Sequence, residues 1–114
     1  MEDFVPFELA IKLKEKGFDG RIGYAYDNGG ECMHTVTEYD VDYIPAPTIT
    51  QVLKWLRNEK KIHISIDIWD GYWGYDILNL PSGNSLYWDA YDENINSYEQ
   101  AALAGIEYVL NDLI

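Results

Sequence analysis

Eight consecutive residues alternate without a break: Ile62-His63-Ile64-Ser65-Ile66-Asp67-Ile68-Trp69. Because successive side chains of a strand point to opposite faces, the four isoleucines line one face and the other four side chains line the opposite face. Asp70-Gly71 then marks a tight hairpin turn, and residues 72–80 form the returning strand. A turn at residues 81–84 leads into a further strand at 85–91. The pattern predicts a three-stranded antiparallel meander.

Three helices are predicted where apolar residues recur at helical spacing. The first spans residues 6–16, the second spans residues 49–60, and the third ends near residue 113. In a capping box, a hydroxyl and an amide side chain each satisfy a backbone N–H group of the first helical turn. Such a box opens the second helix at Thr48-Ile49-Thr50-Gln51 and the third helix at Ser97-Tyr98-Glu99-Gln100.

Two more strands are predicted between the first two helices, at residues 22–26 and 32–39. The turn signal Asp27-Asn28-Gly29-Gly30 joins them as a hairpin, and residues 39–47 form a loop. The predicted order is α-β-β-α-β-β-β-α. We therefore expect one α+β domain over residues 1–114, with three helices and an antiparallel sheet of about five strands.

The bulk composition is that of a globular protein. The chain has 114 residues, of which 47% are hydrophobic and 15% aromatic. A single cysteine excludes an internal disulfide and fits a reducing compartment. The acidic N-terminus lacks the features of a signal peptide, and no apolar run approaches the roughly 20 residues of a membrane span. We expect a cytoplasmic protein.

The charge is unevenly distributed. The net charge is −12, and no Lys or Arg follows Lys61, although the remaining 53 residues carry nine carboxylates. The eight bases lie in residues 12–21 and 54–61, near two predicted helix C-termini, where the helix dipole favours cations. Such a chain repels nucleic acids and anionic membranes, so we expect neither as a direct partner. A basic protein partner is favoured; the alternative is that the acidity only aids solubility.

Three segments, all of them helix-packing motifs, carry a resemblance to known proteins: residues 7–18, 47–57 and 98–110. The chain resembles small uncharacterised proteins encoded by phages and mobile elements of gut bacteria such as Bacteroidetes and Clostridia, and loosely resembles phage α-β-α sandwich domains. The resemblance implies a mobile-element origin and a bacterial cytoplasmic setting. It carries no catalytic residue onto this chain.

No catalytic residue, metal site or cofactor is predicted. Cys32 and His34 share a strand face, but a zinc site needs three or four ligands and there is no second cysteine. His63 and Asp67 are four residues apart on one strand, about 13 Å, so they form no direct pair. Across the sheet, His63 could instead meet Asp76 or Asp89.

The remaining candidate is a binding surface of aromatic rings mixed with carboxylates, which suits a basic protein partner. The central strand offers His63, Asp67 and Trp69. The second strand of the meander adds either Tyr72 and Asp76 or Trp73 and Tyr75, depending on its register. The last strand can add Tyr87, Asp89 and Tyr91. The alternative is that helices cover both faces of the sheet and that these rings belong to the core.

The leading hypothesis is a non-enzymatic acidic interaction module from a phage or mobile element. It would bind, and thereby inhibit, a basic nucleic-acid-binding protein of the host or its defence. A second hypothesis is a small-ligand-binding protein or minor enzyme with a pocket near His63, Asp67 and Trp69. A third is a structural or assembly component of the element. The sequence leaves the oligomeric state open.

Overall fold

A computed structural model describes residues 4–18, 24–26, 33–35, 44–90 and 92–114 of the chain. The predicted α+β class and the order of its elements are confirmed. The helices are α1 (Phe7–Glu15), α2 (Ile49–Trp55) with a π-helical extension η1 (Leu56–Lys60), and α3 (Tyr98–Tyr108) with a π-helical extension η2 (Val109–Leu113). The strands are β1 (Tyr24–Tyr26), β2 (Met33–Thr35), β3 (Ile44–Pro45), β4 (Ile62–Trp69), β5 (Tyr72–Asn79) and β6 (Ser85–Asp89).

The described strands form two separate sheets, whereas one sheet was expected. The smaller sheet has the order β2-β1-β3, and the larger has the order β4-β5-β6, with every pair antiparallel. The short strand β3 lies in the segment predicted as a loop, where Tyr26 pairs with Ile44. The turn expected at residues 27–30 and the candidate ligand Cys32 lie outside the described residues.

The larger sheet is the predicted meander. Its first hairpin pairs Ile62 with Asn79 at one end and Trp69 with Tyr72 at the other, so all eight residues of β4 are matched. The turn between the strands has positive φ at both central positions, 51° at Asp70 and 84° at Gly71. Asp and Gly both tolerate positive φ, and a two-residue turn with this geometry matches the right-handed twist of the strands that it joins.

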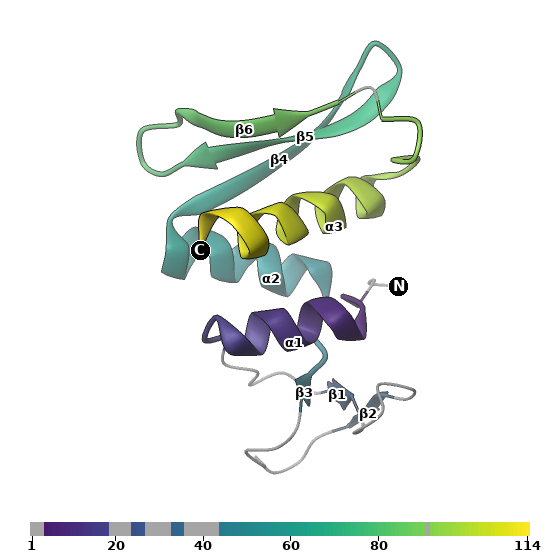
Figure 1. Cartoon of the computed structure of the whole chain (residues 1–114), viewed down its shortest axis with the longest axis vertical. Coiled ribbons are helices and arrows are strands. Elements are labelled where there is room, and N and C mark those ends of the chain that lie inside the picture. Colours follow the sequence, from purple (N-terminus) through teal and green to yellow (C-terminus); the bar gives the residue numbers. More distant parts are fainter. Residues whose placement is uncertain (1–3, 19–23, 27–32, 36–43, 91) are drawn as a thin grey trace.

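The layers stack along the longest dimension of the molecule, which is 44 Å. In Figure 1, α2 and α3 lie beneath the larger sheet, α1 lies beneath them, and the smaller sheet is at the far end. The core between these layers includes Leu56, Ile77 and Ile106, all fully buried. At Gly105, α3 comes so close to the sheet that a Cβ would stand 2.9 Å from Cγ2 of Ile64.

The helix caps follow the predicted chemistry with one exception. At Thr48 the box is complete, since its N–H donates to Oε1 of Gln51 at 2.8 Å and its hydroxyl accepts from the Gln51 N–H at 3.2 Å. The Ser97 hydroxyl accepts from the Gln100 N–H at 3.2 Å. The Gln100 amide oxygen, however, accepts from the N–H of Asn96. In the second box, the bond from the backbone to the Gln100 side chain therefore comes from Asn96, one residue before the predicted donor Ser97.

All three helices run in the same direction across the long axis, so their C-terminal ends lie on one side of the molecule, the left in Figure 1. Each end carries a partial negative charge from its unpaired carbonyl groups. The last turns of η2 contain no base of their own, but Nζ of Lys16, at the end of α1, donates to the Ile114 carbonyl oxygen at 2.7 Å. In the described part of the chain, no helix has both the length and the apolar character needed to cross a membrane.

Candidate binding surface on the larger sheet

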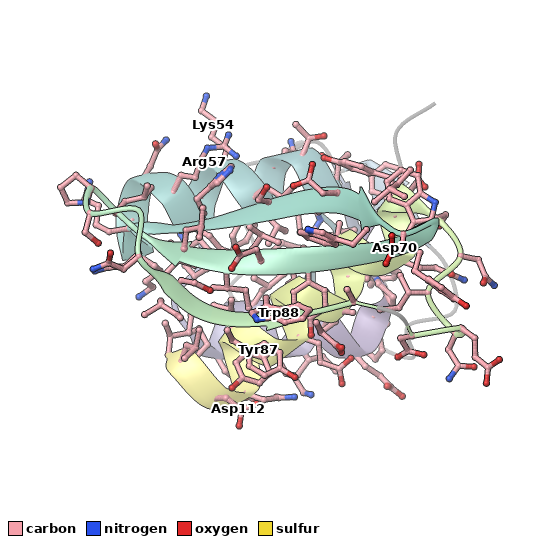
Figure 2. All side chains as sticks on the ribbon, turned by 90° about the horizontal axis from the view of Figure 1, so that it is seen from above. Lys54, Arg57, Asp70, Tyr87, Trp88 and Asp112 are labelled. Atoms are coloured by element: carbon pink, nitrogen blue, oxygen red, sulfur yellow. The ribbon has the colours of Figure 1, made fainter. Side chains whose placement is uncertain are left out.

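The larger sheet has one face covered by helices and one face that no described helix or strand covers. Figure 2 looks down on this uncovered face, with the helices behind the strands. Strand alternation and the pairing register place on it a set of residues that we call the open face. Its members are His63, Ser65, Asp67, Trp69, Tyr72, Gly74, Asp76, Leu78, Ser85, Leu86 and Trp88.

Large aromatic side chains of the open face are exposed. Trp88 on β6 is 57% exposed and Tyr72 on β5 is 44% exposed. The Trp69 indole is half-buried because it lies over Gly74, where a Cβ would stand 2.8 Å from its Cζ3. Aromatic rings held on a sheet and left open to solvent are typical of protein-interaction surfaces.

Two carboxylates lie among these rings, and a serine hydroxyl binds each one. The Ser65 hydroxyl donates to Oδ2 of Asp67 at 2.9 Å. The Ser85 hydroxyl donates to Oδ1 of Asp76 at 2.6 Å. These bonds restrict the rotamers of the carboxylates, and one oxygen of each carboxylate remains able to accept from another molecule.

His63 also lies on this face, but it does not meet a carboxylate. Its cross-strand partner is Leu78, whereas Asp76 stands opposite Ser65 and Asp89 belongs to the other face. The Nδ1 atom of His63 is buried and has no hydrogen-bond partner within the described residues. Within the described strands, His63 therefore pairs with neither Asp76 nor Asp89, and the acid–base pair considered from the sequence is not formed.

Tyr87 and Asp89 lie on the helix-facing side, opposite to the face expected for them. The Tyr87 ring stacks on Tyr108 of the third helix at a centroid distance of 3.9 Å and an interplanar angle of 9°. The assignment was wrong because a register shift at Ile77 and Leu78 sets the phase of β6, and alternation alone cannot reveal that phase. The remaining member of the predicted set, Tyr91, lies outside the described residues.

Sequence reasoning missed Trp88 and Leu86, which occupy the open face in place of those tyrosines. Leu86 is 45% exposed. The sequence does show that Leu86 and Trp88 alternate with more polar neighbours and therefore share one face of the strand. Read as a half-buried strand, that pattern places the two apolar side chains inward, and the structure places them outward.

The covered face creates a different environment for the tyrosines. Burial, together with the negative charge of Asp89, raises the pKa of Tyr75. The same two causes raise the pKa of Tyr87. Both rings pack between the sheet and α3.

A separate hollow of about 370 Å³ lies on the side of the molecule that carries the helix C-termini. It is lined by Lys16, Gly17, Trp55, Glu59 and Lys60, and none of these belongs to the open face. Nζ of Lys60 lies 5.4 Å from the centre of the Trp55 ring. Both lysines thus already have contacts within the chain.

Neither the metal-binding side chains of the described residues nor similarity to other proteins indicates a further site. Over residues 4–18, 24–26, 33–35, 44–90 and 92–114, no three His, Cys, Asp or Glu side chains are grouped to hold a metal ion. No protein-family model, curated protein or solved structure matches this chain significantly.

Proposed function

We propose that this chain is a protein-interaction module that binds a cationic protein through the open face of its larger sheet. The supporting observation is the composition of that face. It holds exposed Trp88 and Tyr72 beside the carboxylates of Asp67 and Asp76, and no Lys or Arg occurs in residues 62–114.

The charge distribution favours a cationic partner. Nine carboxylates and no base in residues 62–114 create a negative field over the sheet and α3. Lys54 and Arg57 project beside the sheet at one margin of the view in Figure 2, and Asp112 lies at the opposite margin. A basic partner is drawn toward the face, and complementary charge mainly raises the rate of association.

The aromatic rings supply the binding energy. Burial of apolar surface contributes about 25 cal/mol per Å², and one well-packed interface tryptophan is typically worth about 2 kcal/mol or more. Trp88 is the strongest candidate for such an anchor, since more than half of its surface is available to a partner. Trp69 is already packed on Gly74 and presents a preorganised ring at little entropic cost.

Basic proteins that bind nucleic acid are the partner class we propose. Their grooves carry clustered Lys and Arg side chains, which an acidic aromatic surface can occupy in competition with phosphates. The resemblance to phage and mobile-element proteins suggests a host or defence protein as the target. Occupation of its groove would make this chain an inhibitor.

Affinity capture tests the proposal. Immobilised wild-type protein is incubated with bacterial lysate at low and high salt, and retained proteins are identified by mass spectrometry. We expect a basic protein that is lost with the triple variant D67N/D76N/W88A. The matched control Y98A/E99Q/E107Q removes one exposed ring and two charges from α3 and should retain it. Equal retention by both variants would refute the open face as the binding surface.

A small-ligand site is a second candidate, favoured by one observation. The Nδ1 atom of His63 has no partner within the described residues, but it is buried, so a ligand could bind it only after the imidazole turns outward. This candidate predicts that a metabolite or nucleotide raises the melting temperature, and that His63→Phe abolishes the shift. A screen in which no compound stabilises the protein would argue against it.

A further inference from the structure

The two carboxylates of the open face lie on neighbouring strands. Asp67 is opposite Gly74, and Asp76 is opposite Ser65. They are therefore diagonal neighbours, and such positions are about 7–8 Å apart. A group that spans several ångströms and carries more than one donor can reach both of them.

The two carboxylates are oriented, and the strands do not neutralise them. Each accepts a bond from one serine hydroxyl, at 2.9 Å for Asp67 and 2.6 Å for Asp76. No Lys or Arg occurs anywhere in the three strands. A cation that binds here must come from outside this sheet.

Two indoles stand beside Asp76. Trp88 is its direct cross-strand partner on β6 and is 57% exposed. The next position along β5 on the same face is Gly74, and the Trp69 ring covers it. Asp76 therefore lies between a fixed ring and an exposed ring, with a second carboxylate on the diagonal.

We infer that this arrangement receives an arginine side chain of the partner, an inference that rests on the proposed function. A guanidinium group is planar and carries five N–H donors, so it can stack on the Trp88 indole while it donates to Asp76 and Asp67. A lysine ammonium is a compact point charge that cannot stack and is more costly to dehydrate. The face thus discriminates between two cations of equal charge.

Matched peptides test the inference. Fluorescently labelled arginine–glycine and lysine–glycine repeats of equal length are titrated with the protein, and affinity is read from fluorescence anisotropy. We expect the arginine peptide to bind at least tenfold more tightly than the lysine peptide. Asp76→Asn, which keeps an acceptor for Ser85, and Trp88→Ala should each remove most of this preference. Trp88→Phe should keep part of it, and Tyr98→Ala on α3 should leave it unchanged.

The possible outcomes separate the two proposals. Equal binding of both peptides, lost together in D67N/D76N/W88A, would overturn the arginine preference and leave the cationic interaction surface intact. Binding of neither peptide would count against both proposals. An arginine preference that persists in both Asp76→Asn and Trp88→Ala would place the site elsewhere and overturn the inference. Circular dichroism of each variant confirms that it is folded.

Discussion

The indole of Trp69 occupies the space that a side chain at position 74 would fill, since a Cβ on Gly74 would stand 2.8 Å from Cζ3 of that ring. The same Cβ would also collide with the backbone carbonyl oxygen of Asp89 on the neighbouring strand. Gly74 therefore allows both the close approach of β5 to the chain at Asp89 and the fixed position of one of the two rings beside Asp76.

Gly74→Ala should destabilise the protein by about 1–3 kcal/mol, the usual cost of overpacking, because β6 and the Trp69 ring must both move. Urea denaturation measures the change. In the double variant W69A/G74A the collision with the indole is absent, so the two substitutions should be less costly together than the sum of the single effects. Strict additivity would show that the ring and the glycine are not coupled.

Gly105→Ala should also destabilise the protein, against the intrinsic preference of helices for alanine, which is worth about 1 kcal/mol. The new methyl group would stand 2.9 Å from Ile64 Cγ2 and 3.3 Å from the Tyr75 ring. Glu107→Ala, on the exposed side of the same helix, should be close to neutral. A gain in melting temperature for Gly105→Ala would contradict the close packing of α3 on the sheet.

Lys16→Met should cost about 0.5–1.5 kcal/mol, the usual net value of one hydrogen bond. The Lys16 Nζ atom donates to the Ile114 carbonyl on the side of the molecule where the three helix C-termini lie. Because part of this interaction is electrostatic, the difference from wild type should shrink at high salt. Lys54→Met removes an exposed base without this contact and serves as the control. Equal effects of the two substitutions would refute a special role for Lys16.

Alkaline pH should destabilise the fold through Tyr75. Its pKa is raised above its ordinary value of 10.0, chiefly by burial, so the folded state keeps the proton after the unfolded state has lost it. This contribution is fully present below about pH 10 and falls as the pH rises through the folded pKa, by at most about 1.4 kcal/mol per pH unit. Tyr75→Phe should flatten the decline of unfolding free energy above pH 10. An unchanged slope in Tyr75→Phe would contradict the assignment.

Local signals in the sequence accounted for much of the fold. The unbroken alternation of residues 62–69 defined β4, and Asp70-Gly71 defined its hairpin, because both are properties of neighbouring residues. The capping box at Thr48 marked the helix start correctly for the same reason. Strand β3 could not be predicted, since Ile44-Pro45 is too short to alternate and exists only through its pairing with β1.

The composition of the open face was harder to predict because it depends on non-local geometry. Alternation correctly placed His63, Asp67 and Trp69 on one face. Only the register of β5 shows that Tyr72 and Asp76, and not Trp73 and Tyr75, share that face. In β6, the register shift between Ile77 and Leu78 places Trp88 on the open face and Tyr87 on the covered face. That the face is open at all follows from the positions of α2 and α3, which both lie on the isoleucine side.

The central claim is that the open face binds a cationic partner, and backbone chemical-shift mapping tests it most directly. An arginine–glycine repeat peptide is titrated into isotopically labelled protein, and the amide and indole N–H signals are followed. We predict that the largest changes occur at Ser65, Asp67, Asp76 and the Trp88 indole. Changes confined to the acidic residues of α3 and η2, with an unperturbed Trp88, would contradict the claim.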